Sequence, residues 1–460
     1  MKRAKKLYVM LGVLALVCAA ALIASSVKER GENIAVSGEE LLAIPVESVE
    51  AFHWEEDGEE PLAFHRDGER WVYDGDEDFP ASTDKVEGLL EQFESFGVGF
   101  AIEDAENLGD YGLATPTAVL TLETEDGEHT LELGDFSQMD SQRYVSVGDD
   151  KVYLAIHDPY EEFSNTTLRS LIEDDEVPAM DDVQQMNFTG AEEYQIQRVD
   201  SGTFARKDDI WAVEQDSEKI ALDPDLVEGY LDLFTGSLLV NYVDYHATAE
   251  ELAAYGLDTP ELTVEVKQGE DTFALHIGLD PDEERAWEKM SVKEREEADP
   301  VTAYGQVDGS QIVYELHAED YDGLAACAVD DLRHKEVLPA NLEDIRRLEA
   351  TVDGEECVLT AKPEKEELRW EYSGEKVDAY DLEDALSSLR ITDFGDFQAG
   401  AQELIFKVQL ASKEEIHVAL YRYDGDTCVV TVNDKTLGLV DRSDAMDLVE
   451  NLRTIVLNRK

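Results

Sequence analysis

Cysteine is scarce in this sequence. The 460 residues include four, at positions 18, 327, 357 and 428, and none forms a C-x-x-C pair. Nothing in that spacing resembles the disulfide framework of a small secreted domain. Cys357 and Cys428 lie on expected strands of the same domain and would pair only if those strands were neighbours. Buried free thiols are the favoured interpretation.

Basic residues are also scarce. The chain has 38 Lys and Arg against 107 Asp and Glu, which gives a formal net charge of −69. A surface of this charge repels nucleic acid and anionic lipid headgroups, so neither is an expected partner. It favours solubility, weak association with divalent cations and electrostatic steering toward basic partners.

Recognisable catalytic patterns are missing. The nine histidines occur singly, without H-E-x-x-H, so the sequence predicts no zinc ligands. Gly97-Val98-Gly99 lacks the third glycine of a dinucleotide loop, and no G-x-S-x-G or Walker-type segment stands in a fitting context. The acidic run from Asp74 to Asp78 lacks the spacing of a calcium loop and is interpreted as a solvated turn. We therefore assign no catalytic, cofactor-binding or metal-ligating residue and expect a protein that is not an enzyme.

Long hydrophobic runs are limited to one, from Leu7 to Ala24. At about 1.5 Å per residue it spans roughly 27 Å, close to the thickness of a bilayer core. The basic residues in 1–6 predict a cytoplasmic N-terminus, a transmembrane anchor over residues 7–26 and an extracytoplasmic remainder that begins with a linker over residues 27–43. The expected location is the cell membrane, crossed once. A cleaved signal peptide, or a lipoprotein modified at Cys18, is a less favoured alternative.

What the chain does contain is an internal repeat. Residues 105–116 and 249–260 share the pattern A-E-x-L-x-x-Y-G-L-x-T-P. The glycine after tyrosine suits a backbone position with positive φ, and the proline stops a helical turn. We interpret the motif as a structural turn packed onto a core rather than as a binding loop. Its assigned residues are Leu108, Tyr111, Gly112, Leu113 and Pro116 in the first copy, and Leu252, Tyr255, Gly256, Leu257 and Pro260 in the second.

The repeat continues on both sides of the motif. Downstream, alternating apolar and polar residues lead to Gly134 and Gly278 and predict a half-buried strand that ends in a turn. Upstream, apolar residues at helical spacing predict an amphipathic helix in each copy, and the same spacing recurs between residues 382 and 389. Three good N-cap candidates precede these helices: Ser82, Asp223 and Asp378. Pro224, after Asp223, is the expected first helical residue of the second copy. A tryptophan on a short strand precedes each helix as well: Trp71, on a strand expected over residues 70–73, Trp211 and Trp370.

These observations predict an α+β fold of tandem repeats, in which each unit has an antiparallel sheet, a capped helix and a closing helix, with the closing helix of the first unit expected over about residues 160–172. The first unit is expected over residues 44–180 and the second over 181–340. A divergent third unit, which lacks the Y-G-L pattern, is expected over 341–460. The second unit carries a charged insertion at about residues 280–300, which we expect to be a solvated loop or short helix.

The segments Leu108–Pro116 and Leu252–Pro260, with the strands that follow them, resemble the bacterial family known as domain of unknown function 4340. The basic N-terminus and single hydrophobic anchor fit the same family. The resemblance implies an envelope protein held by one N-terminal helix. Some members are encoded beside ABC-transporter and gliding-type accessory genes, which implies an extracytoplasmic accessory role. It implies no catalytic residue.

The sequence leaves three functions open. The favoured hypothesis is a non-enzymatic envelope protein that scaffolds or regulates protein partners, such as an ABC-type membrane complex. The second is a module that binds extracellular glycan, peptide or divalent cations. A cell-wall hydrolase is a minor third hypothesis.

Overall fold

The computed structural model describes residues 38–457, with the exception of residues 104, 106, 216, 353, 365 and 366. The expected N-terminus (1–6), membrane anchor (7–26) and most of the linker lie outside these described residues. Within the described part of the chain, no helix is long and apolar enough to cross a membrane.

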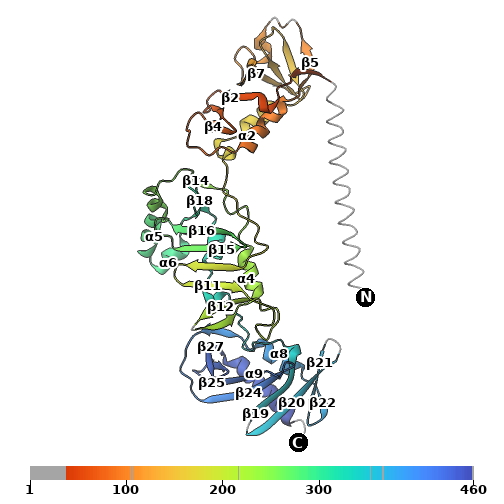
Figure 1. Ribbon diagram of the computed structural model, residues 1–460, viewed down its shortest axis with the longest axis vertical. Coiled ribbons are helices and arrows are strands. Elements are labelled where there is room, and N and C mark those ends of the chain that lie inside the picture. Colours follow the sequence, from red (N-terminus) through yellow and green to blue (C-terminus); the bar gives the residue numbers. More distant parts are fainter. Residues whose placement is uncertain are drawn as a thin grey trace. The chain divides into compact units, whose positions relative to one another are not determined.

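The chain divides into two compact units. The first runs to Asp175 and also includes Asp244–His246, and the second comprises Glu176–Val243 and the residues from Ala247 onward. Within the described residues the strands form three nine-stranded, mostly antiparallel sheets. Figure 1 labels a selection of their elements.

The first sheet has the order β1-β5-β9-β8-β7-β6-β2-β3-β4. Its strands are β1 (Glu39–Leu42), β2 (Val49–Glu56), β3 (Leu62–Asp67), β4 (Arg70–Tyr73), β5 (Phe96–Ile102), β6 (Ala118–Thr124), β7 (Gly127–Ser137), β8 (Gln142–Ser146) and β9 (Val152–Ala155). The accompanying helices are α2 (Thr83–Leu90) and α3 (Pro159–Asn165), with the short 3-10 helices η1 (Val46–Ser48), η2 (Glu91–Phe93), η3 (Leu108–Tyr111) and η4 (Leu168–Leu171).

The second sheet has the order β13-β12-β11-β10-β15-β16-β17-β18-β14. Its strands are β10 (Gln185–Thr189), β11 (Glu193–Arg198), β12 (Trp211–Gln215), β13 (Glu218–Ala221), β14 (Tyr242–Asp244), β15 (Leu262–Gln268), β16 (Asp271–Leu279), β17 (Ala303–Val307) and β18 (Val313–Leu316). The accompanying helices are α4 (Pro224–Leu231), α5 (Pro281–Glu288), α6 (Val292–Glu297) and α7 (Ala318–Ala325), with η5 (Glu251–Tyr255) and η6 (Val329–Asp331).

The third sheet has the order β22-β21-β20-β19-β24-β25-β26-β27-β23. Its strands are β19 (Ile345–Val352), β20 (Glu355–Glu364), β21 (Glu367–Tyr372), β22 (Glu375–Val377), β23 (Ile391–Phe394), β24 (Gln402–Leu410), β25 (Glu415–Arg422), β26 (Thr427–Val432) and β27 (Lys435–Asp441). The accompanying helices are α8 (Tyr380–Ser388) and α9 (Arg442–Leu457), with η7 (Leu342–Asp344).

Eight strands of each sheet follow the same path through the chain. The order β4-β3-β2-β6-β7-β8-β9-β5 of the first sheet recurs as β12-β11-β10-β15-β16-β17-β18-β14 and as β21-β20-β19-β24-β25-β26-β27-β23. One helix precedes the β5-type strand and a second closes each sheet. The predicted α+β repeats are thereby confirmed, including the divergent third copy. The ninth strand is β1 beside β5 in the first sheet, and β13 or β22 at the opposite edge in the others.

The core of each copy is formed by the sheet and its helices, and in the third copy the closing helix α9 packs on β19, β26 and β27. The tryptophans of β4, β12 and β21 are buried, as are the inward faces of α2, α4 and α8. Burial of one large apolar side chain stabilises the fold by roughly 1.5–3 kcal/mol. The helical and alternating patterns of the sequence therefore mark the surfaces that meet in the core.

The three first helices begin in different ways. Asp223 caps α4 by accepting a hydrogen bond from the Asp225 amide, and Pro224 is the first helical residue, as predicted. Ser82 occupies the N-cap position of α2, but its side chain makes no capping hydrogen bond. The prediction for α8 is wrong by one residue, because Ala379 and not Asp378 is the N-cap.

The charged insertion of the second copy forms the short helices α5 and α6, which bury none of their residues. They connect β16 to β17, whose ends meet where Leu279 pairs with Ala303. The expectation of a short helical, solvated insertion is confirmed.

Three local predictions differ from the structure. The closing helix expected over 160–172 breaks after α3, because Thr166 is extended and β-branched residues disfavour helix. β7 continues through Gly134 to Ser137 instead of ending at the glycine. The end of the expected linker forms β1, which pairs with β5.

The cysteines within the described residues are free and buried, as predicted. Cys357 lies on β20 and Cys428 on β26, and β19, β24 and β25 separate these two strands in the sheet. A disulfide between them is therefore excluded by the topology.

Candidate functional site

The Y-G-L motif closes a 3-10 helix in both copies. Gly112 ends η3 with a φ of 74°, and Gly256 ends η5 with a φ of 68°. Both values lie in the left-handed region that glycine adopts at least cost. The predicted positive φ is confirmed at both positions.

A second glycine explains why each motif packs closely on the following strand. A Cβ on Gly134 would lie 2.1 Å from the carbonyl oxygen of Tyr111, and a Cβ on Gly278 would lie 2.6 Å from that of Gly256. These glycines are therefore required by backbone contact with the turn, not by a strand end.

The remaining motif residues make packing contacts. Tyr111 packs edge to face on Tyr144 at 5.0 Å, and Tyr255 packs in the same way on Tyr304 at 5.0 Å. The exposures of the apolar residues differ. Leu113 and Leu257 are buried, Leu252, Pro116 and Pro260 are half-buried, and Leu108, expected in the core, is 41% exposed.

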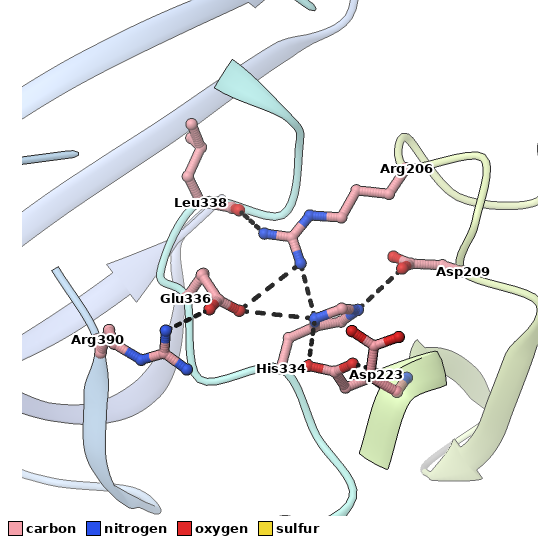
Figure 2. A network of polar contacts seen from close by, with 8 residues as sticks. Arg206, Asp209, Asp223, His334, Glu336, Leu338 and Arg390 are labelled. Carbon is pink, nitrogen blue, oxygen red and sulfur yellow. Dashed lines mark hydrogen bonds and ion pairs between the residues drawn. The ribbon is translucent and has the colours of Figure 1, made fainter. Parts of the chain in front are cut away.

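A polar network unrelated to the motif lies where the chain passes from the second sheet to the third (Figure 2). Arg333 pairs through its backbone with Leu222 beside the second sheet, and Glu336 pairs in the same way with Arg390 beside the third. His334 stands between these two pairings. The network thus forms a joint between two copies of the repeat within the second unit.

His334 is surrounded by carboxylates from different segments. Its Nε2 lies 2.8 Å from Asp209, which precedes β12 and is 4% exposed. Its Nδ1 lies 3.3 Å from Oδ2 of Asp223 at the start of α4 and 3.6 Å from Oε2 of Glu336. We name these four residues, together with Arg206, the His334 cluster.

Arg206 supplies the positive charge of the cluster. Its Nη1 lies 2.7 Å from Nδ1 of His334 and 3.8 Å from Glu336, and its Nη2 donates to the Leu338 carbonyl at 2.9 Å. Its Nε is buried without a hydrogen-bond partner. On the other side of the joint, Arg390 lies 2.7 Å from Glu336.

The contacts of the two ring nitrogens indicate one tautomer of His334. A guanidinium has only donors, so Nδ1 must accept the hydrogen bond from Arg206. Nε2 then carries the proton and donates it to Asp209. In this tautomer the lone pair of Nδ1 is directed toward Arg206, Asp223 and Glu336.

The sequence did not reveal this cluster. Asp223 was assigned only a capping role, and the histidines occur without a neighbouring ligand pair. His334 and Asp209 are 125 positions apart, so only the folded sheets bring them together. Among the described residues, Asp223, His334 and Glu336 are the group of potential metal-ligating side chains whose donor atoms all lie within 4.8 Å of one another.

A second feature of the second sheet is a small pocket of about 110 Å³ beside α7. Its wall includes the stacked rings of Phe188 and Tyr194, and the Tyr321 hydroxyl donates to Glu261 at 2.9 Å. Burial raises the pKa of the Cys327 thiol to about 11, so the thiol in this wall is neutral at physiological pH. The lining comprises Phe188, Ala191, Glu192, Tyr194, Glu261, Leu262, Tyr321, Ala325, Cys327 and Ala328.

The fold and sites define a class of proteins made of tandem α+β modules that share one antiparallel sheet topology. A family model described as domain of unknown function (DUF4340) matches residues 71–237 and again residues 211–405, and the chain belongs to this family. The matches begin at Trp71 and Trp211, equivalent residues of the first two sheets, and the second match extends into β24 of the third. No curated protein matches the chain.

Proposed function

We propose that the protein is a non-enzymatic, membrane-anchored, extracytoplasmic scaffold or accessory subunit of an envelope complex, such as an ABC-type transporter. The observation that carries this proposal is that the same order of eight strands occurs in all three sheets. Arrays of such modules present several surfaces along one chain, which suits the assembly of protein partners.

The residues shared between the copies also favour a framework over a reaction centre. They are glycines at close backbone contacts, tyrosines in ring pairs and tryptophans in the cores. Burial raises the pKa of the Cys357 thiol to about 11, as it does for Cys327, whereas a catalytic thiol needs a lowered pKa.

The net charge of −69 supports a basic protein surface as the contact. Steering between opposite charges raises association rates and falls with salt. The hydrophobic run near the N-terminus supports the membrane location. The negative charge would repel nucleic acid, so nucleic acid is not proposed as a partner.

The test is affinity purification of the tagged full-length protein from gently solubilised native membranes, followed by mass spectrometry. We expect recovery of transporter subunits, and loss of those subunits when the residues after 43 are deleted. Recovery of the protein alone, even after chemical crosslinking, would contradict the proposal.

The pocket beside α7 favours a second candidate function, the binding of a small ligand. Aromatic rings with the carboxylates of Glu192 and Glu261 suit an organic cation, such as the side chain of a basic peptide. A thermal-shift screen tests this function, because a ligand of the native state raises the melting temperature by mass action. A saturable rise that is lost in Tyr321→Ala would support it.

A further inference from the structure

We propose that Asp223, His334 and Glu336 form a binding site for one divalent transition-metal ion, with Zn²⁺ as the cation that fits best. One nitrogen and two carboxylate oxygens meet at this point. Imidazole with carboxylates is a donor set that zinc accepts, and three protein ligands leave a fourth position for water.

Two of the three donor spacings are close to those around a tetrahedral ion. Ligand atoms at about 2.0–2.2 Å from zinc are separated from one another by roughly 3.3–3.5 Å. In the structure, Nδ1 of His334 lies 3.3 Å from Asp223 and 3.6 Å from Glu336. The donor atoms of Asp223 and Glu336 lie within 4.8 Å of each other, so the three side chains can close on the ion once Arg206 moves away.

His334 has the hydrogen-bonding arrangement of a metal-ligating histidine. A metal ligand must present a lone pair, and its other ring nitrogen is commonly held by a carboxylate. The buried Asp209 holds Nε2 at 2.8 Å, so the proton stays on that nitrogen and Nδ1 faces the two carboxylates.

Arg206 now occupies the place of the cation, with Nη1 2.7 Å from Nδ1 of His334 (Figure 2). Its fit is incomplete, because its Nε is buried without a partner. Such a group forgoes a hydrogen bond that it would make in water. Binding of the ion requires the guanidinium to move away from His334 and Glu336, while Nη2 can stay near the Leu338 carbonyl.

The bound ion would connect two copies of the repeat. Asp223 begins α4 beside the second sheet, whereas Glu336 pairs with Arg390 beside the third. One ion would then hold the joint through its own ligands, with Arg206 released from His334 and Glu336.

The experiment titrates the purified full-length chain with ZnCl₂ by isothermal calorimetry, beside four variants. Arg206→Met removes the competing cation at similar volume, and His334→Ala removes a ligand. Asp209→Asn weakens the residue that orients the ring. His276→Ala is the matched control, because it removes a half-buried histidine that pairs with an exposed aspartate (3.3 Å to Asp308) elsewhere in the second unit.

We expect one saturable zinc site in the wild type and in His276→Ala. Arg206→Met should bind at least about tenfold more tightly, because a like charge close to the ion disappears. Asp209→Asn should bind about 10–100-fold more weakly, and His334→Ala should lose the site. If His334→Ala does not fold, the zinc affinities of Arg206→Met and Asp209→Asn test the proposal.

Equal zinc binding by the wild type, Arg206→Met and Asp209→Asn would place the ion on the acidic surface and overturn the proposal. If zinc bound only to the Arg206→Met variant, the wild-type chain would have no zinc site and the proposal would also be overturned. A saturating excess of MgCl₂ in every titration removes the diffuse association expected of a strongly acidic protein.

Discussion

At the scale of single residues, glycines decide how the Y-G-L turns meet their sheets. Gly112 and Gly256 provide the left-handed backbone, while Gly134 and Gly278 leave room for the carbonyl groups of the turn. The sequence indicated the first role, because tyrosine-glycine before proline is a local pattern. It could not indicate the second, since the close contact joins segments that only the fold brings together.

We expect Gly134→Ala to destabilise the first unit by about 2–4 kcal/mol, because its Cβ would lie 2.1 Å from the Tyr111 carbonyl and the turn would have to move. The matched control is Gly88→Ala in α2, where a Cβ meets nothing within 4 Å. That change should stabilise by about 0.5–1 kcal/mol. Urea unfolding measures both, and equal effects would contradict the role given to Gly134.

The buried thiols lead to a prediction on pH. Burial raises the pKa of Cys327 and Cys357 from 9.0 to about 11. Both thiols should therefore resist a thiol reagent at pH 8 in the native protein and react in denaturant. A Cys18→Ser background removes the remaining thiol outside the described residues. Rapid labelling of Cys327 or Cys357 in the native protein would contradict this prediction, because it would show that the buried site opens to solvent.

The same shift has a consequence for stability. A thiol whose folded pKa is raised favours the folded state below pH 9, and this contribution is lost as pH rises from about 9 through 11. The free energy of unfolding should accordingly fall over this interval. Replacement of both thiols by serine or alanine should reduce the slope.

At the scale of elements, local patterns predicted most helices and strands. β4 occupies the predicted residues 70–73, and α4 begins with the predicted cap at Asp223. The errors had two causes. The β-branched Thr166 is extended and breaks the closing helix, a local effect, whereas β1 forms only because the edge of β5 accepts a partner strand.

The insertion helices α5 and α6 should be dispensable for stability. Neither buries a residue, and Leu279 and Ala303 at their base pair directly. Replacement of residues 282–299 by a short Gly/Ser turn should change the free energy of unfolding by less than about 1 kcal/mol. Leu324→Ala in α7, a fully buried position, should cost about 2–5 kcal/mol. A fall in melting temperature equal to that of Leu324→Ala would show that the insertion packs on the fold.

At the scale of the whole molecule, repetition was the part most open to sequence analysis. Two copies shared a motif, and the third was recognisable from its helix spacing and Trp370 because one topology imposes one pattern. The His334 cluster could not be predicted from the sequence, because it is not part of the repeat. It exists in one place, at the joint between two copies, and its residues come from separate segments that no repeat pattern aligns.

The joint itself should depend on Arg206 when no metal is added. The Val337 amide donates to Leu389 and the Ile391 amide to Lys335, so the segment through His334 is bonded to the third copy. Arg206 ties the same segment to the loop before β12 through His334 and the Leu338 carbonyl. Its removal would leave Asp223 and Glu336 close together without that compensating charge.

We therefore expect Arg206→Ala to weaken the joint by about 1.5–3 kcal/mol, the usual contribution of hydrogen bonds made by a charged group. Hydrogen exchange should accelerate roughly 10–150-fold in peptides that cover residues 335–341, because local opening sets the exchange rate there. Peptides of the first unit should keep their rates. Arg369→Ala is the control, because Arg369 is exposed and Glu371 keeps its ion pair with Lys362, so the loss should be less than about 1 kcal/mol. Unchanged exchange at 335–341 would mean that backbone pairing alone holds the joint. Acceleration in both units would mean that the substitution acts on the whole fold.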